Sequence, residues 1–290
     1  MIEIKDKKVN ISSKIFVDGG DPVETEKAKS LLGFVDGQTT NPTLISKNPE
    51  VQRRIREGGK FTREEINLFY KKIVAEIYKI TNGPISIEVY ADKNTKSEEM
   101  LNEARELRKW TENNYIKIPI TKEGLRAAQK AIQEDIPINM TLCFSQEQAA
   151  AVYSATKGAK KPVFVSPFIG RLDDRGENGM NLVENILKMY QKGDGHVLLL
   201  AASIRSLDHL LAAIKLSAPI ITVPLMIIQE WAEKNFILPK ENFNYRPSNL
   251  KDIPYKEISL EKDWQDYEIN HELTEVGLER FSTDWEKLLG

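Results

Sequence analysis

Lys117 is the residue in this sequence whose type and position most directly suggest chemistry. It lies between Ile116 and Ile118 in a short apolar run, and strand alternation would place it on the opposite face from both isoleucines. Burial disfavours the charged ammonium form of a lysine, so a neutral amine becomes available to attack a carbonyl carbon. The alternative is a lysine that extends from a strand end into solvent.

Carboxylate, amide and hydroxyl side chains occur at comparable positions in other apolar runs. Asp18 ends one run and Glu88 lies within another, where either could exchange protons with a reacting group. Each also has an ordinary alternative, a turn-capping aspartate and a surface glutamate. Asn41 precedes Pro42, a pair that also begins helices. The other polar side chains within or at the end of an apolar run are Asn139, Thr141 and Ser166.

Two arginines and a serine follow the later apolar runs, at Arg171, Ser203 and Arg205. Two guanidinium groups and a hydroxyl at one rim would bind a phosphate dianion through charge-assisted hydrogen bonds. A surface salt bridge is the simpler alternative for each arginine, for example between Arg171 and Asp173 or Asp174.

A lysine amine, two carboxylates and a phosphate-binding group together suit Schiff-base chemistry on a ketose phosphate. The iminium formed on the lysine accepts an electron pair, so the bond between C3 and C4 can break without a metal. The three histidines, His196, His209 and His271, are far apart in sequence and too few for a typical zinc site. No Walker motif or glycine fingerprint is present. We therefore expect neither a metal nor another cofactor.

The spacing of apolar residues predicts the elements that would position these side chains. Short apolar runs alternate with helical patterns, and the runs lack the clean alternation of strands exposed on one face. Eight strand-then-helix units favour a closed (β/α)8 TIM barrel over a doubly wound sheet. The expected strands are 14–18, 34–37, 85–89, 115–119, 137–144, 162–166, 197–202 and 220–223. The expected helices are 22–32, 62–80, 97–110, 123–133, 145–156, 177–191, 207–216 and 225–234.

Barrel enzymes build their active sites at the carboxyl ends of the strands, where the polar residues above are expected to lie. Residues 1–235 would form this catalytic barrel. Residues 236–290 contain several prolines and many polar residues. We expect them to form an extension, packed on the barrel or on a neighbouring subunit, that ends in a helix at 274–289.

The composition excludes several other classes of protein. The 290 residues include 41 lysines and arginines against 43 aspartates and glutamates, a net charge of −2 that argues against a nucleic-acid binder. A single cysteine, Cys143, rules out an internal disulfide and favours a reducing compartment. Residues 1–8 lack a signal-peptide pattern, and the apolar runs are shorter than a membrane span. We expect a cytoplasmic protein without membrane contact.

Seven short stretches form an ordered set along the chain: 16–21, 39–45, 86–89, 115–119, 139–145, 166–171 and 202–205. In this order they resemble the transaldolase family, with a likeness that covers roughly residues 14–235. Residues 273–285 also resemble the C-terminal segment of that family.

The resemblance implies transfer of a dihydroxyacetone unit from fructose 6-phosphate or sedoheptulose 7-phosphate to an aldose phosphate, in the non-oxidative pentose phosphate branch. Lys117 would carry the Schiff base, and Asp18 would move the proton of the C4 hydroxyl. Glu88, with Thr141 and a bound water, would move protons while the imine forms. The implied substrate-binding residues are Asn41, Asn139, Ser166, Phe168, Arg171, Ser203 and Arg205.

Three alternatives remain at this stage. Related fructose 6-phosphate aldolases release free dihydroxyacetone, but they tend to have tyrosine at the position of Phe168 and glutamine at that of Glu88. Both positions therefore favour a transferase over a lyase. A non-catalytic barrel that binds sugar phosphates is a second alternative, and a pyridoxal-phosphate enzyme, which would be yellow, is a third. Both a monomer and a homo-oligomer are compatible with the sequence.

Overall fold

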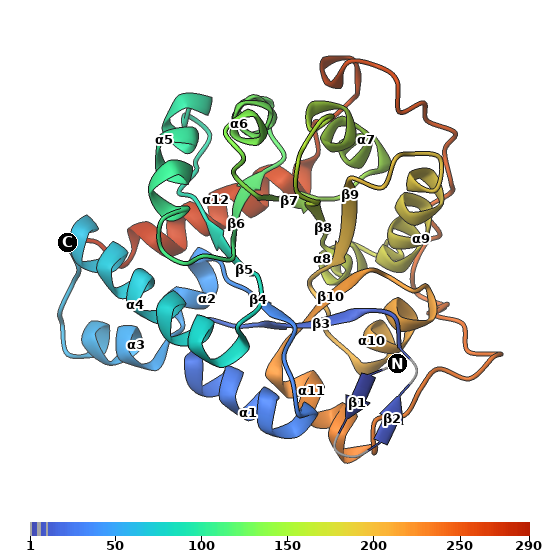
Figure 1. Ribbon diagram of the computed structural model, residues 1–290, viewed down its shortest axis with the longest axis horizontal. Helices are drawn as coiled ribbons and strands as arrows, with labels where there is room; N and C mark the ends of the chain where they lie inside the picture. Colours follow the sequence, from blue (N-terminus) through green and yellow to red (C-terminus); the bar gives the residue numbers. More distant parts are fainter. Residues whose placement is uncertain (1, 5–6, 10) are drawn as a thin grey trace.

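Eight parallel strands close into a barrel in the order β10-β3-β4-β5-β6-β7-β8-β9 (Figure 1). The computed structural model describes residues 2–4, 7–9 and 11–290. The predicted (β/α)8 architecture is therefore confirmed. The barrel strands are β3 Lys14–Asp18, β4 Gly37–Thr39, β5 Ile85–Glu88, β6 Asn114–Pro119, β7 Ile138–Cys143, β8 Val163–Pro167, β9 Val197–Ala201 and β10 Ile220–Val223.

Helices cover the outside of the barrel, and most begin at a side chain that caps the helix. Thr62 and Glu65 form a capping box at the start of α4, and the Ser145 and Ser206 side chains accept hydrogen bonds at the starts of α7 and α10. The covering helices are α1 Pro22–Leu32, α4 Arg63–Thr81, α5 Ser97–Leu107, α6 Lys122–Gln133, α7 Gln146–Ala155, α9 Gly179–Tyr190, α10 Leu207–Lys215 and α11 Leu225–Glu233.

Short additional elements occur between the predicted strands and helices. α3 Pro49–Arg56 follows α2 Pro42–Ser46, and α8 Ile169–Asp174 follows β8. The helix α2 confirms the capping role of Asn41, whose Oδ1 accepts a hydrogen bond from the Leu44 amide at 2.9 Å. Near the N-terminus, β1 Ile2–Ile4 pairs antiparallel with β2 Lys7–Val9. Residues 1, 5, 6 and 10, most of them within the stretch without a signal-peptide pattern, lie outside the described residues.

The predicted strand at 34–37 is wrong, because the second barrel strand is Gly37–Thr39. Asp36 instead accepts a hydrogen bond on Oδ2 from the Ile15 amide at 2.8 Å, which fixes this loop beside β3. The strand begins at Gly37, where a Cβ would lie only 2.6 Å from the Phe16 ring. A glycine therefore lets the chain enter the barrel against this aromatic side chain.

The barrel interior is divided into an apolar layer and a polar layer. Because strand residues two apart share a face, Phe16, Tyr115 and Phe164 lie one step below Asp18, Lys117 and Ser166. Tyr115 and Phe164 stack with ring centroids 3.9 Å apart, and Phe16 packs edge-on against Phe164 at 6.3 Å. The aromatic layer fills the barrel, so the polar side chains lie on a closed apolar floor.

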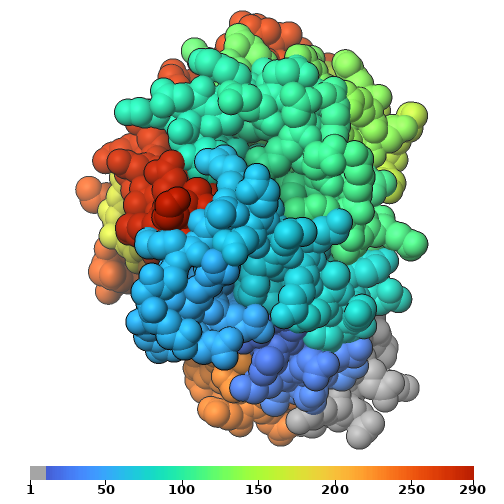
Figure 2. All heavy atoms as spheres, turned by 90° about the vertical axis from the view of Figure 1, so that its left-hand side faces the viewer, coloured from blue at the N-terminus to red at the C-terminus, as the bar shows by residue number. Residues whose placement is uncertain are grey.

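The chain after α11 returns over the barrel and ends in α12 Glu272–Glu286, preceded by the 3₁₀ helix η1 Trp264–Asp266. α12, red in Figure 1, packs against α2 and β7 on the same barrel. Its Asp284 carboxylate accepts a hydrogen bond from Thr43 at 2.5 Å. Figure 2 shows the C-terminal residues beside the blue segment near residue 60, where Phe61 forms a bridge with Leu289.

Within the described part of the chain, no helix combines the length and apolar character that crossing a membrane requires.

Candidate functional site

A cavity of about 190 Å³ opens at the carboxyl ends of the barrel strands. Most of the predicted site residues line it: Asp18, Asn41, Lys117, Ser166, Phe168, Arg171, Ser203 and Arg205. The other three lie directly behind this lining. Glu88 contacts Lys117, Asn139 contacts Ser166, and Thr141 lies two residues beyond Asn139 on the same strand face.

Lys117 points into the barrel and not into solvent. The residue is only 3% exposed, and its Nζ lies 3.2 Å from Glu88 Oε2. The register of the sheet explains this ion pair, because Glu88 on β5 lies directly beside Lys117 on β6. Nζ also donates a hydrogen bond to the Thr40 carbonyl at 3.3 Å. The amine is thus held in one place by Glu88 on β5 and by Thr40, the residue directly after β4.

Tyr70 supports this pair from the helix layer, although the sequence analysis did not identify it. Its hydroxyl contacts the Thr40 hydroxyl and accepts a hydrogen bond from the Glu88 amide at 3.2 Å. The ring is buried on α4 and packs edge-on against Trp110, with centroids 5.4 Å apart. Tyr70 therefore holds Thr40 and Glu88, the two residues that contact Lys117 Nζ, in position.

Burial raises the pKa of both carboxyl groups near the amine. For Asp18, desolvation is the largest cause, and it is opposed by Lys117 and by a hydrogen bond from Thr39 to Oδ1 at 2.7 Å. Desolvation also raises the pKa of Glu88, again opposed chiefly by Lys117. A raised pKa lies closer to the pH at which the enzyme works, so the carboxyl group can both accept and release a proton there.

Asn139 is oriented by its neighbours in the polar layer. Its Nδ2 donates to Ser86 Oγ at 3.0 Å, and its Oδ1 accepts from Ser166 Oγ at 2.7 Å. Thr141 differs, because its buried hydroxyl has no hydrogen-bond partner within the described residues. Since a buried hydroxyl normally finds a partner, this position suits a small polar molecule bound between protein groups.

Arg171 and Arg205 add two positive charges to the lining of the cavity. The Arg171 guanidinium lies between the Phe168 and Phe281 rings, 5.2 Å from each centroid. Burial and the nearby Arg280 lower the pKa of Arg171 to about 10. It has no carboxylate ion pair within the described part of the chain, whereas Arg205 pairs with Asp174 at 2.5 Å. The salt-bridge alternative therefore applies to Arg205 and not to Arg171.

Several lining residues were missed by the sequence analysis. Arg280 and Phe281 reach the cavity from α12, and Lys47 reaches it from the end of α2. With Lys117, Arg171 and Arg205, they give the cavity a positive excess suited to an anionic ligand. The signal for α12 was the resemblance of residues 273–285 to the C-terminal segment of a known family. For Lys47 the sequence carried no comparable signal.

Gly277 determines how closely α12 approaches Arg171. A Cβ at this position would lie 2.6 Å from Arg171 Nη1 and 2.6 Å from Leu142 Cδ2. The same helix turn is tied to β7 by a hydrogen bond from Thr274 Oγ1 to the Leu142 carbonyl at 3.0 Å. The glycine thus allows the helix to pack directly on the guanidinium.

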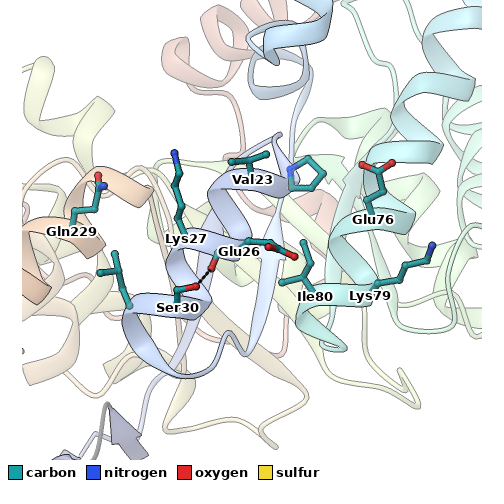
Figure 3. Close-up of a pocket in the computed structure, with 10 residues that line it drawn as sticks. Val23, Glu26, Lys27, Ser30, Glu76, Lys79, Ile80 and Gln229 are labelled. Atoms are coloured by element: carbon teal, nitrogen blue, oxygen red, sulfur yellow. Dashed lines mark hydrogen bonds between the residues drawn. The ribbon is translucent and has the colours of Figure 1, made fainter.

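A larger cavity of about 700 Å³ lies outside the barrel, between α1, α4 and α11 (Figure 3). Its charged side chains are dispersed, and the amines of Lys27 and Lys79 point away from each other in Figure 3. The buried ionisable groups that mark a reactive site lie instead at the barrel mouth. We therefore assign the functional site to the smaller cavity. Among the described residues, no three His, Cys, Asp or Glu side chains lie close enough to share a metal ion.

Comparisons with known proteins show which proteins this chain is similar to. A family model described as transaldolase/fructose-6-phosphate aldolase matches residues 15–290. A protein named "Probable transaldolase" from Anaeromyxobacter sp. (strain Fw109-5) is 35% identical, covering 95% of this chain and 98% of its own. Another of that name, from Caldicellulosiruptor saccharolyticus, is 36% identical with the same coverage. Among solved structures, a mutant tryptophan synthase α-subunit from Pyrococcus furiosus has a TM-score of 0.48 and 14% identity, covering 79% of this chain and 93% of that one.

Replacing Asp18 by asparagine is expected to stabilise the fold at neutral pH. A carboxyl whose pKa is raised on folding contributes stability below its ordinary pKa of 3.8, and this is lost as the pH rises through the raised value. Asp18→Asn should therefore increase the free energy of unfolding at pH 7 by about 1–2 kcal/mol. The gain should shrink towards pH 4. Guanidinium unfolding between pH 4 and pH 8 measures this, with the exposed Asp252→Asn as control. A less stable variant at pH 7 would contradict the expectation.

Replacing Gly277 by alanine is expected to weaken anion binding without unfolding the protein. The added methyl must displace the Arg171 guanidinium, while alanine favours the helix by about 1 kcal/mol relative to glycine. We expect the Kd for inorganic phosphate to rise about fivefold in calorimetric titration. Val276→Ala, at the neighbouring exposed position, should leave it unchanged. Equal affinities for Gly277→Ala and the unmodified chain would show that α12 does not control Arg171.

Proposed function

Because the chain belongs to the transaldolase/fructose-6-phosphate aldolase family, we propose that it transfers a dihydroxyacetone unit from a ketose phosphate to an aldose phosphate through a Schiff base on Lys117. The observation that carries this proposal is the buried amine of Lys117, paired with Glu88 on one side and facing a cavity lined by Arg171 and Arg205 on the other. The donor would be fructose 6-phosphate or sedoheptulose 7-phosphate.

The first step joins Lys117 to the C2 carbonyl of the ketose. Glu88, 3.2 Å from Nζ and with a raised pKa, takes a proton from the ammonium and leaves a nucleophilic amine. The amine adds to C2 to form a carbinolamine, which then loses its hydroxyl as water to give the iminium. Glu88 supplies the proton for that departure, through a water bound at the unpartnered Thr141 hydroxyl.

The second step breaks the bond between C3 and C4. Asp18 accepts the proton of the C4 hydroxyl, C4 becomes an aldehyde, and the electron pair of the broken bond flows into the iminium to form an enamine. Thr39 donates a hydrogen bond to Asp18 at 2.7 Å and so orients its carboxylate. The aldose phosphate leaves, an acceptor aldehyde enters, and the same steps in reverse form the new bond with the proton returned by Asp18.

The remaining lining residues bind the substrate. The phosphate would be bound by Arg171, Ser203 and Arg205. The positive charge of the cavity lining is increased further by Arg280 and Lys47. Substrate hydroxyls would be oriented by Asn41, Asn139, Ser166 and the wall formed by Phe168. The hydrogen bond between Ser166 and Asn139, 2.7 Å long, keeps two of these groups in a fixed relation.

Phe168 favours transfer over simple release of dihydroxyacetone. Its ring centroid lies 5.8 Å from Lys117 Nζ, and a hydrocarbon ring cannot donate a proton to the enamine. The three-carbon unit would therefore stay on the enzyme until an acceptor arrives. We place this activity in the cytoplasm, in the non-oxidative pentose phosphate branch. Residues 1–235 would supply the catalytic barrel and residues 236–290 an extension that shapes its mouth.

Borohydride reduction in the presence of fructose 6-phosphate is expected to fix a stable adduct on Lys117. Peptide mass mapping locates the adduct, which reduction of the iminium to a secondary amine makes permanent. Lys117→Ala should abolish the adduct and lower kcat by at least about 10³-fold. Lys122→Ala, a lysine just outside the barrel on α6, serves as control and should leave the adduct in place. An adduct on another lysine, or none, would overturn the proposal.

Product formation is expected to depend on an acceptor. With fructose 6-phosphate alone, glyceraldehyde 3-phosphate should appear as one burst equal to the enzyme concentration, because the enamine is not released. Adding erythrose 4-phosphate should start continuous turnover. Steady release of free dihydroxyacetone without an acceptor would instead identify a lyase.

A further inference from the structure

A polar cluster beside the cavity links the extension to the phosphate-binding arginines. It consists of Asp173 on α8, His209 on α10 and Tyr245 in the segment that follows α11. His209 is 4% exposed, and its Nε2 lies 2.8 Å from Asp173 Oδ2 and 2.7 Å from the Tyr245 hydroxyl. The Tyr245 hydroxyl donates to the same Asp173 oxygen. The mechanism above uses none of these three groups.

The cluster holds the main chain of Arg205 through Nδ1, the other ring nitrogen of His209. Nδ1 accepts a hydrogen bond from the main-chain amide of Arg205 at 3.2 Å. A ring nitrogen that accepts a hydrogen bond carries no proton, so Nε2 is the protonated nitrogen and donates to Asp173. Asp173 in turn fixes this tautomer and the orientation of the ring, with Tyr245 as a second donor to the same carboxylate.

Both phosphate-binding arginines depend on this arrangement. His209 anchors the main chain of Arg205 next to Ser203, whose φ of 59° lies in the left-handed region that a serine adopts only when its surroundings hold it there. Asp173 lies in α8, two residues after Arg171, and its Oδ1 accepts a hydrogen bond from the Gly179 amide at 2.9 Å. The cluster thus holds the loop that carries one arginine and the short helix that carries the other.

Arg205 has little room beside Gly170, so a small movement of the loop that carries Ser203 and Arg205 would change how Arg171 and Arg205 are placed relative to each other. A Cβ on Gly170 would lie 2.6 Å from Arg205 Nε and 2.6 Å from the Ser203 carbonyl. The Arg205 side chain therefore passes over a glycine, in contact with its backbone. Its guanidinium forms an ion pair with Asp174 at 2.5 Å. A loop released by His209 would move Arg205 relative to Arg171.

We propose that Tyr245 is a positioning residue: through Asp173 and His209 it holds Arg205 in place and thereby sets the affinity of the cavity for a phosphate group. The proposal rests on the proposed function only for the identity of the phosphate-bearing substrate. It makes the segment after α11 a determinant of phosphate affinity, although no part of that segment before α12 lines the cavity.

Tyr245→Phe tests this directly, because it keeps the ring that packs on His209 at a centroid distance of 5.0 Å and removes only the hydroxyl. We expect the Kd for inorganic phosphate and the KM for fructose 6-phosphate to rise together by about 3- to 10-fold, with kcat within about twofold. Tyr267→Phe is the matched control, since this buried tyrosine of the same extension donates to the Ser259 carbonyl at 2.7 Å. It should change neither constant. An unchanged Kd for Tyr245→Phe would overturn the proposal.

Two substitutions of His209 separate positioning from general stability. Asparagine can place an amide oxygen near the position of Nδ1 and keep the acceptor for the Arg205 amide, whereas glutamine reaches towards Asp173 and loses that acceptor. We expect His209→Asn to bind inorganic phosphate more tightly than His209→Gln. Equal weakening by both would argue for loss of packing alone and against the proposal.

A separate measurement distinguishes failure of the proposed Schiff-base function from failure of the proposal for Tyr245. Borohydride trapping of unphosphorylated dihydroxyacetone reports on Lys117 and does not involve Arg171 or Arg205, because this ligand has no phosphate. The Tyr245→Phe variant should form the reduced dihydroxyacetone adduct to the same extent as the unmodified chain. Reduced trapping in Tyr245→Phe would overturn the proposal, because the cluster would then act on the amine. If the unmodified chain itself does not trap, the Schiff-base function falls, while the phosphate affinities still decide the role of Tyr245.

Discussion

The ion pair between Lys117 and Glu88 is the interaction on which the rest of the site depends. Two opposite charges removed from water gain little net stability from each other, since desolvation offsets most of their attraction. The fold therefore holds this pair at a cost and surrounds it with supports: the Thr40 carbonyl, the Tyr70 hydroxyl behind Glu88 and the aromatic floor beneath. In the proposed mechanism its value lies in proton exchange, because a proton can pass between the two groups without reaching bulk water.

The period of two along each strand explains how one barrel provides both the floor and the site. The same alternation that places Tyr115 inward places Lys117 inward one step higher, and Phe164 is related to Ser166 in the same way. Apolar side chains thus fill the lower interior and polar ones line the mouth. This is why the strand pattern alone could predict that Lys117, Asp18 and the other polar residues converge.

Other parts of the site could not be predicted in this way. Arg280 and Phe281 reach the cavity because α12 crosses the mouth, and that path is set by contacts between distant residues, such as Thr43 with Asp284. Local periodicity carries no information about such contacts. The strand expected at 34–37 failed for a related reason, since the Ile15 amide donates its hydrogen bond to the Asp36 side chain and so is not available for strand pairing there. Tyr245, in a segment without regular elements, gave no pattern at all.

The aromatic floor has a consequence for the order of events in the proposed reaction. Because Phe16, Tyr115 and Phe164 block the barrel below Lys117, the described structure leaves the mouth as the way in and out of the cavity. The departing aldose and the incoming one must then use a single opening, one after the other. The proposed covalent chemistry predicts double-displacement kinetics, with the first product gone before the second sugar binds, and a single opening is compatible with that order.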